Sequence, residues 1–205
     1  MNNIFFIGLM GAGKTTIGRL IAKQLGMVFY DSDYEIERKT GVKIPLIFEL
    51  EGEAGFRKRE TTIIDELTQL SNVVIATGGG AVLLPENQAM FKKNGQVIYL
   101  RASVHDLWLR TRHDKTRPLL QGGNIKQKLE KLFIERDPIY TKLADCIVDT
   151  GPQSAADITH YIEQKLQKQN EHLNCVNSSQ LMEHLKNKPA ENVIDHDVSL
   201  INTSN

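Results

Sequence analysis

The residues with the clearest chemistry stand near the start of the chain, in the run Gly8-Leu9-Met10-Gly11-Ala12-Gly13-Lys14-Thr15. This run fits the pattern G-x-x-x-x-G-K-[ST], in which glycines let backbone N–H groups turn toward phosphate oxygens. The lysine of such a loop reaches the outer phosphates, and the hydroxyl of its last residue holds Mg²⁺. The pattern therefore predicts a site for a nucleoside triphosphate.

The residues on both sides of this loop support the same interpretation. The loop follows an apolar run of strand type, Ile4–Ile7. A strand, a glycine loop and a helix N-terminus, in that order, make an anion site. A plain glycine turn is the alternative, which this context disfavours. The apolar residues after the loop recur at the spacing of one helix face: Ile17, Leu20, Ile21 and Leu25.

Two aspartates follow a second apolar run, residues 27–30. Asp31 and Asp33 are separated by one residue at the end of a strand, so their side chains point the same way. The strand at 73–76 ends in Thr77 without the aspartate that usually supports Mg²⁺, so we expect Asp31 to do so through water. Asp33 is then available to accept a hydroxyl proton or to orient that hydroxyl. Alternatively, both carboxylates only cap the next helix.

The strand at 73–76 runs into three consecutive glycines, Gly78, Gly79 and Gly80, whose backbone can approach a ligand closely. Two arginines, Arg57 and Arg136, could make forked contacts with a substrate carboxylate. A solvated helix arginine is the default interpretation of each when taken alone.

A charged, glycine-containing segment over residues 112–124 is interpreted as a mobile flap. It contains an X-Pro step at Arg117-Pro118 that disfavours helix. Closure of this flap would bring Arg117 to a phosphoryl group during its transfer. The segment therefore predicts a lid that carries a cation.

The elements that must position these residues alternate between short buried strands and helices. This pattern predicts parallel βαβ units, an open α/β sandwich of three layers. Sites in such sheets lie beyond the carboxyl ends of the strands, so the phosphate loop, the aspartates and the glycines should meet in one cleft. Strands are expected at 4–7, 27–30, 73–76, 97–100 and 146–148, and helices at 34–39, 45–51, 54–70, 86–93, 104–111, 125–143 (with a break or kink at Pro138) and 154–167.

The composition limits the kinds of partner that we expect. The 205 residues carry 25 Lys and Arg against 25 Asp and Glu, so no overall basic field favours nucleic acid. Cys146 and Cys175 form no CxxC pair and predict neither a disulfide framework nor a metal site, which favours a reducing cytoplasm. No stretch approaches the roughly 20 apolar residues of a membrane span. We expect a soluble protein.

The chain changes character after residue 168. Residues 169–205 contain no glycine and seven asparagines, with five acidic residues against two lysines. We expect a domain at 1–168 and a polar tail at 169–205 that is mostly disordered or loosely attached. A partner-binding segment is the alternative for the tail.

Several runs together give the chain a resemblance to the shikimate kinase family of P-loop proteins. They are GLMGAGKTTIGRLIAKQL, FYDSDYEIE, FELEGEAGFRKRE, ATGGGAV, KTRPLL and ERDPIY, and they fall within about residues 3–167. The resemblance implies a five-stranded parallel sheet in the order 2-3-1-4-5 with a lid. It also implies ATP-dependent phosphorylation of the 3-hydroxyl of shikimate in the pathway to chorismate, by a monomeric enzyme.

The resemblance also implies a role for each site residue. Lys14, Asp33 and Arg117 would be catalytic, and Thr15 and Asp31 would hold one Mg²⁺. The shikimate contacts would be Asp33, Arg57, Gly78, Gly79, Gly80 and Arg136. The ATP contacts would be Gly11, Ala12, Gly13, Lys14, Thr15, Thr16, Arg110, Arg117 and Gln153.

Two other functions are weighed against this one. The first is a kinase for another small polyol acid such as gluconate, against which Arg57, Arg136 and the triple glycine argue. The second is a catalytically inactive nucleotide-binding regulator, a class that usually loses the lysine, the base or the lid arginine. All three are present here as Lys14, Asp33 and Arg117.

Overall fold

The computed structural model describes residues 3–114, 117–120, 122–151 and 153–168. The chain divides into two compact units, residues 1–163 and 164–205. The predicted tail at 169–205 lies outside the described residues, as do positions 115, 116 and 121 of the predicted lid.

Five parallel strands form one sheet in the order β2-β3-β1-β4-β5, which confirms the order that the family resemblance implied. Each predicted strand is present with its bounds shifted by at most two residues. The strands are β1 (Asn3–Ile7), β2 (Val28–Asp31), β3 (Val73–Ala76), β4 (Gly95–Arg101) and β5 (Cys146–Asp149).

The two central strands explain why the strand sequences read as apolar runs without alternation. Every residue of β1 and β3 is buried, because helices cover both faces of the sheet. Phe6 of β1 pairs with Ala76 of β3, and the N–H of Thr77 donates to the Phe6 carbonyl at 3.1 Å. The phosphate loop after β1 and the glycines after β3 therefore leave the sheet side by side.

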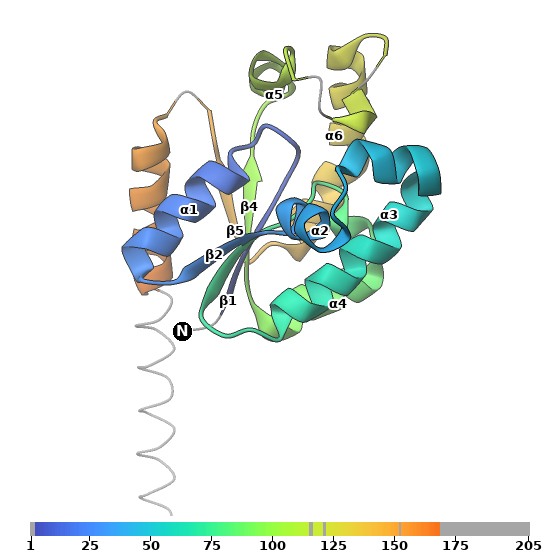
Figure 1. Cartoon of the computed structure of the whole chain (residues 1–205). Helices are drawn as coiled ribbons and strands as arrows, with labels where there is room; N and C mark the ends of the chain where they lie inside the picture. The colour runs from blue at the N-terminus through green and yellow to red at the C-terminus, as the bar shows by residue number, and fades with distance from the viewer. Residues whose placement is uncertain (1–2, 115–116, 121, 152, 169–205) are drawn as a thin grey trace, which may run out of the picture. The chain divides into compact units, whose positions relative to one another are not determined.

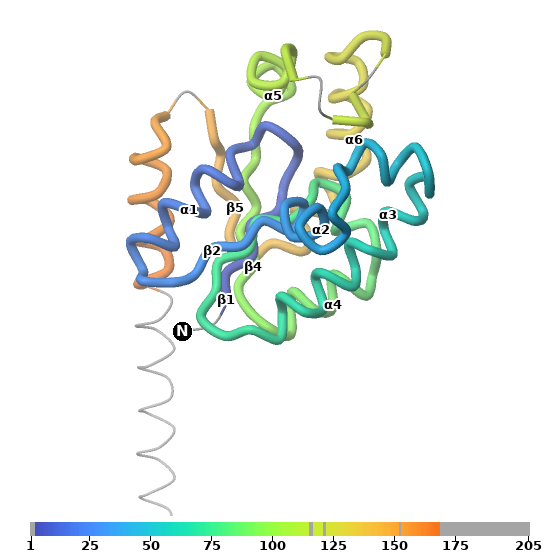
Figure 2. The backbone as a smooth tube through the Cα atoms, in the orientation of Figure 1, coloured from blue at the N-terminus to red at the C-terminus, as the bar shows by residue number. Residues whose placement is uncertain are grey.

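The helices flank this sheet in two layers, as Figures 1 and 2 show: α1 and residues 155–163 lie on one side, and α3 and α4 on the other. This arrangement confirms the predicted three-layer α/β fold. The helices are α1 (Lys14–Leu25), α2 (Ser32–Thr40), α3 (Ile44–Thr68), α4 (Pro85–Asn94), α5 (Val104–Thr111) and α6 (Ile125–Leu143), with residues 155–163 also helical.

The two helices expected at 45–51 and 54–70 are confirmed. They follow one another within α3, which is kinked between them at Gly52, where the backbone is not helical (φ 67°, ψ −176°). The helix expected at 125–143 is present as α6 and continues through Pro138, so a break there was wrong, whereas a kink at this proline stays a prediction. Tyr140 and Leu143 beyond the proline are buried, and this packing outweighs the lost backbone hydrogen bond.

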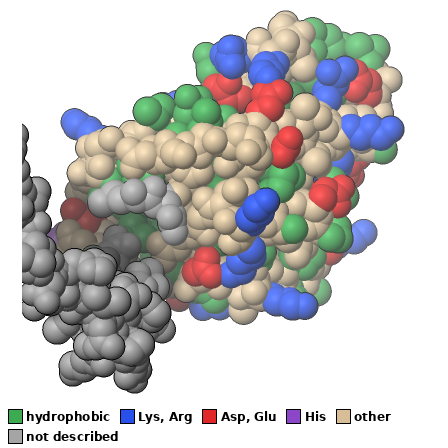
Figure 3. Space-filling view, turned by 90° about the horizontal axis from the view of Figure 1, so that it is seen from below, with side chains coloured by type: hydrophobic (Ala, Val, Ile, Leu, Met, Phe, Trp, Pro, Cys, Tyr) green, Lys and Arg blue, Asp and Glu red, His purple; other side chains and the backbone are tan. Residues whose placement is uncertain are grey.

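Two short 3-10 turns were not predicted, η1 (Ala81–Leu83) and η2 (Pro118–Leu120). The second lies in the predicted lid, whose mobility stays a prediction. On the face drawn in Figure 3, basic and acidic side chains lie interspersed. Among the described residues, no helix is both long enough and apolar enough to span a bilayer.

Candidate active site

A cavity of about 1180 Å³ contains the chemistry-bearing residues at the carboxyl ends of β1, β2 and β3. The predicted convergence of the three strand ends is therefore confirmed. Every residue that the sequence nominated for the site lines this cavity: Gly11, Ala12, Gly13, Lys14, Thr15, Thr16, Asp31, Asp33, Arg57, Gly78, Gly79, Gly80, Arg110, Arg117, Arg136 and Gln153.

The phosphate loop has the backbone geometry that its glycines predicted. Gly11 has φ 82° and Gly13 has φ 98°, a left-handed conformation that residues with a side chain rarely adopt. Gly13 also precedes the first turn of α1 and offers no side-chain cap to it. The backbone N–H groups of that turn are therefore available to an anion.

The side chain of Lys14 is held against the phosphate loop by two backbone carbonyl groups of that loop. Its Nζ donates to the carbonyl oxygens of Gly8 at 2.7 Å and Leu9 at 3.0 Å. Burial lowers the pKa of Lys14 to about 8, although the carboxylates of Asp33 and Asp31 act in the opposite direction. An incoming phosphate would raise this pKa again, because it supplies negative charge beside the ammonium group.

Asp31 joins the phosphate loop to α2. The hydroxyl of Thr15 donates to Asp31 Oδ2 at 2.7 Å, while Asp31 Oδ1 accepts from the N–H of Asp33 at 3.1 Å and of Tyr34 at 3.4 Å. The capping alternative thus holds for Asp31, which is the N-cap of α2 and also contacts the predicted Mg²⁺ ligand Thr15. It does not hold for Asp33.

Asp33 lines the cavity and keeps one carboxylate oxygen available to a ligand. Its Oδ1 is buried and, within the described part of the chain, has no hydrogen-bond partner. Burial raises the pKa of Asp33 to about 6, with a further contribution from Asp31, while Lys14, Arg117 and Arg57 oppose the rise. An unpartnered buried acceptor with a pKa near neutrality suits a group that receives or orients a proton.

Arg57 is fixed from two sides by carboxylates on its own helix. Its Nη1 donates to Glu60 at 2.6 Å and its Nη2 to Glu53 at 2.8 Å. The guanidinium lies over Gly80, because a Cβ built there would come within 2.1 Å of Arg57 Nη2. Only a glycine at position 80 leaves room for this arginine.

Glu60 is a site residue that the sequence analysis did not nominate. Its side chain is fully buried, and its Oε1 has no hydrogen-bond partner among the described residues. Burial raises the pKa of Glu60 to about 7 despite the neighbouring Arg57. The signal that could have found it is the i, i+3 spacing from Arg57 on one helix face.

Arg136 is the second buried arginine of the cavity, only 3% exposed. Its Nε and Nη1 have no hydrogen-bond partner within the described residues, and its Nε lies 3.9 Å from the half-exposed Glu135. A buried guanidinium with free N–H groups is costly unless a ligand completes it. The site therefore has a place for an anion at Arg136 in addition to the phosphate loop.

Three further nominated residues lie at the open side of the cavity. Arg110 donates to the backbone carbonyls of Gly11 at 3.2 Å, Thr150 at 2.8 Å and Gly151 at 3.0 Å, so its guanidinium braces the phosphate loop. The Nε of Arg117 donates to Asp114 at 2.7 Å, and Gln153 lines the cavity. Nucleotide contacts by these three side chains stay predictions.

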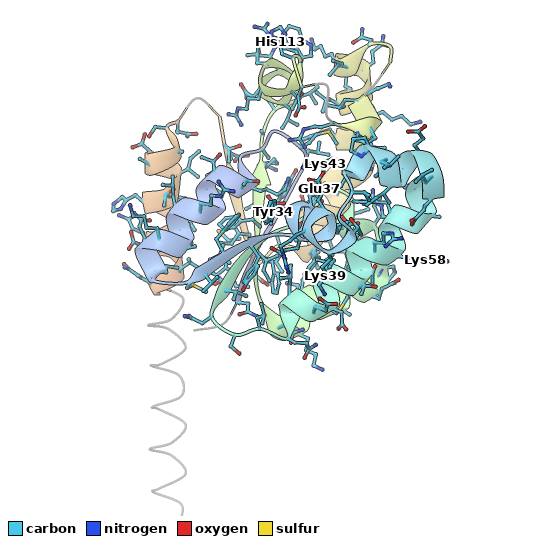
Figure 4. All side chains as sticks on the ribbon, viewed as in Figure 1. Tyr34, Glu37, Lys39, Lys43, Lys58 and His113 are labelled. Carbon is cyan, nitrogen blue, oxygen red and sulfur yellow. The ribbon has the colours of Figure 1, made fainter. Side chains whose placement is uncertain are left out.

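The rim of the cavity is tied together where α2 meets α3. Glu37 accepts from Lys43 Nζ at 2.7 Å and from the backbone N–H of Ile44 at 3.1 Å. Figure 4 labels Glu37 and Lys43 beside α2, together with Tyr34, and all three line the cavity. Glu37 thus caps the start of α3, the helix that carries Arg57.

The fold and the cavity define the class of the protein as a P-loop kinase of a small molecule. The family model for shikimate kinase matches residues 10–167. The chain is 60% identical over 165 residues to a shikimate kinase of Thiobacillus denitrificans, and 57% identical over 165 residues to one of Burkholderia lata. Each match covers 80% of this chain and 90% of the relative.

Solved structures give the same result. A shikimate kinase from Acinetobacter baumannii, in complex with shikimate, is 48% identical with a TM-score of 0.81, and the match covers 82% of this chain and 94% of the other. A gluconokinase from Sinorhizobium meliloti is 16% identical with a TM-score of 0.54, over 84% and 95% of the two chains, which shows a shared fold alone. The chain belongs to the shikimate kinase family.

Proposed function

We propose that this chain phosphorylates the 3-hydroxyl of shikimate with ATP, using the cavity at the strand ends, and so serves the synthesis of chorismate and aromatic amino acids. The observation that carries the proposal is the pair of arginines, Arg57 and the buried Arg136, that line the same cavity as the phosphate loop. Arg136 keeps two unpartnered N–H groups in the same cavity as Asp33 and the loop. A carboxylate ligand would satisfy them.

The phosphate donor binds at the loop end of the cavity in this proposal. Backbone N–H groups from Gly11 to Thr16 surround the phosphates, and Lys14 turns from the carbonyls of Gly8 and Leu9 to the outer phosphates. Arg117 adds positive charge from the lid, close enough to affect the pKa of Lys14. Arg110 braces the loop, and Gln153 lies beside the adenine.

Shikimate, which has one carboxylate and three hydroxyl groups, binds at the other end. Arg57 and Arg136 hold the carboxylate by forked hydrogen bonds. Asp33 and the backbone of Gly78–Gly80 hold the hydroxyl groups. The apolar part of the cavity wall, which includes the stacked rings of Phe48 and Phe56, suits the carbon ring.

Mg²⁺ fits beside the loop. Thr15 and Asp31 are hydrogen-bonded at 2.7 Å on the cavity wall, and both are hard oxygen ligands of the kind that Mg²⁺ takes together with water and phosphate oxygens. Thr15 would hold the ion directly, and Asp31 through water. When bound, Mg²⁺ neutralises charge on the transferred phosphoryl group.

The chemistry that this chain supplies is positioning and electrostatics. Asp33 orients the 3-hydroxyl of shikimate in line with the terminal phosphoryl group and accepts its proton as the new O–P bond forms. The bond between the terminal phosphorus and the bridging oxygen breaks in the same step, and ADP leaves with that oxygen. Lys14 and Arg117 stabilise the negative charge on the phosphoryl oxygens. The lid excludes water, which would otherwise compete with shikimate as the acceptor.

We infer from the family resemblance that the enzyme is a monomer, and from the cysteine content that it works in the cytoplasm. Size-exclusion chromatography with light scattering tests the monomeric state, and a mass near twice 23.1 kDa would contradict it.

The function is tested by a steady-state assay of purified protein with ATP, Mg²⁺ and shikimate. Release of ADP should depend on both shikimate and Mg²⁺, and mass spectrometry should detect shikimate 3-phosphate. Nucleotide binding without turnover would favour the inactive regulator instead. ADP release without shikimate 3-phosphate would show that the protein hydrolyses ATP and does not transfer the phosphoryl group to this acceptor.

A further inference from the structure

Tyr140 occupies a central position behind the acceptor end of the cavity, although no motif pointed to it. It lies in α6, one turn after Arg136, and its side chain is fully buried. Its hydroxyl donates to the carbonyl oxygen of Gly79, which belongs to the triple-glycine turn after β3. One phenol therefore connects α6 to that turn.

The same phenol lies one helical turn from the buried arginine and senses its charge. Burial raises the pKa of Tyr140 well above its usual value, and the neighbouring Arg136 guanidinium acts in the opposite direction. The phenol thus donates to Gly79 with the Arg136 guanidinium beside it. Arg136 is left with Nε and Nη1 unpartnered among the described residues, and this guanidinium lines the cavity.

The bond to Gly79 also fixes the backbone beyond it. The peptide unit that carries the Gly79 carbonyl carries the N–H of Gly80 on its opposite side, because the bond is trans. Glycine peptides rotate more freely than others, so an external hydrogen bond has more effect here than in most turns. Fixing the carbonyl therefore fixes the direction of an N–H at the cavity wall.

We propose that Tyr140 is a positioning residue for the acceptor: its hydroxyl aligns the Arg136 guanidinium with the Gly79–Gly80 peptide, so that both meet one substrate molecule. This inference rests on the proposed function, since it assigns Arg136 and the glycines to shikimate. Tyr140 lies behind the two groups that would touch substrate, so it acts through them.

The chain offers a matched control in Tyr99. Its ring stacks on that of Tyr140 with centroids 4.8 Å apart, and it is 1% exposed. Its hydroxyl donates to Asp137 at 2.7 Å instead of to the glycine turn. Tyr99→Phe therefore removes a buried phenol from the same cluster without removing the bond to Gly79.

The test compares steady-state kinetics of the wild-type protein, Tyr140→Phe and Tyr99→Phe. We expect Tyr140→Phe to raise the KM for shikimate about tenfold, with kcat and the KM for ATP within about twofold of wild type, since one net hydrogen bond changes affinity by about this factor. We expect Tyr99→Phe to leave the KM for shikimate within about twofold. An unchanged KM in Tyr140→Phe, or equal rises in both variants, would overturn the inference.

A second readout distinguishes alignment of Arg136 from a general loosening of the site. Wild-type protein should prefer shikimate to its uncharged carboxamide, and Tyr140→Phe should reduce that preference. An undiminished preference would contradict a role through the arginine. Wild-type protein that does not phosphorylate shikimate would contradict the proposed function instead, so the two failures are distinguishable.

A measurement on wild-type protein covers the case in which Tyr140→Phe does not fold. With tyrosine labelled by ¹³C at the ring carbon that bears the hydroxyl, the Tyr140 resonance is the one that remains in each of the single variants Tyr30→Phe, Tyr34→Phe, Tyr99→Phe and Tyr161→Phe. It should shift on addition of shikimate and much less on addition of a non-hydrolysable ATP analogue. No shift with shikimate would overturn the inference.

Discussion

Asp31 and Asp33 show how neighbouring carboxylates acquire different chemistry from their surroundings. Both carboxylate oxygens of Asp31 accept hydrogen bonds, one from the Thr15 hydroxyl and the other from backbone N–H groups at the start of α2. Asp33 keeps a buried oxygen without a partner among the described residues, and burial raises its pKa to about 6. The first carboxylate is suited to an ion beside the phosphates, and the second to the proton of the acceptor.

Replacement of Asp33 tests its role at the residue scale. Asp33→Asn keeps the shape of the side chain and removes the basic oxygen, so kcat should fall about 10²-fold or more. The affinity for ATP should stay within a factor of about two, because the proposed function assigns Asp33 to shikimate and not to ATP. Titration calorimetry with a non-hydrolysable analogue checks the affinity. Near-normal turnover would refute the role.

Glu60 gives a prediction about pH and stability. Its pKa in the folded protein is about 7, above the ordinary 4.5. As the pH rises from 4.5 to 7, the unfolded chain releases this proton before the folded protein does, so the wild-type free energy of unfolding falls. Glu60→Gln has no carboxyl group at this position, so its free energy of unfolding does not fall in this way. The difference in free energy of unfolding, variant minus wild type, should therefore rise over that range by on the order of 2 kcal/mol.

Chemical denaturation at pH 5 and pH 8 measures this difference. Glu51→Gln serves as a control. Glu51 is exposed, and its hydrogen bond with Arg59 lowers the pKa of the Glu51 carboxyl, so the change of this variant's relative stability with pH should be small and opposite in sign. A relative stability of Glu60→Gln that stays constant with pH would indicate that Glu60 ionises normally in the folded protein.

At the scale of elements, the turn after β3 packs closely against the Arg57 side chain of helix α3 because position 80 of that turn is a glycine. Gly80 has φ −102°, which any residue can adopt, so backbone strain does not require glycine there. Space does, because a Cβ would come 2.1 Å from Arg57 Nη2 and 2.4 Å from Arg57 Cζ. The side chain of Asn87 further holds this turn by donating to the Ala81 carbonyl at 2.9 Å.

Gly80→Ala tests this fit. The methyl group should displace the Arg57 guanidinium and raise the KM for shikimate by about tenfold or more, while the KM for ATP stays within about twofold. Steady-state kinetics with each substrate varied in turn gives both constants. An equal effect on the two substrates would mean that the turn supports the whole site instead of Arg57.

The sequence predicted most elements because apolar runs and helical periodicity are local properties. It also predicted which strand ends carry the site, since parallel strands present their carboxyl ends at one edge. It left open whether α6 breaks or only kinks at Pro138, and it did not predict that Glu60 and Tyr140 lie beside the two arginines. Those features depend on contacts between α3, α6 and the β3 turn, which lie far apart in the sequence.

At the scale of the whole molecule, every nominated site residue lies between Gly11 and Gln153, within the first compact unit. Residues 169–205 contribute none, and their composition is poor in the apolar residues that a core requires. Deletion of residues 170–205 should therefore leave the melting temperature within about 2 °C and the activity nearly unchanged. A large loss of either would show that the tail packs on the catalytic domain.

The central claim is that the phosphate loop binds the donor while the other strand ends select the acceptor. A competition assay tests it most directly: the protein receives ATP, Mg²⁺ and equimolar shikimate, quinate and gluconate, and mass spectrometry quantifies each phosphorylated product. We expect shikimate 3-phosphate as the dominant product, because in the proposed function Arg57 and Arg136 hold the carboxylate and the glycine turn holds the ring hydroxyls. Gluconate phosphate in equal or greater amount would contradict it.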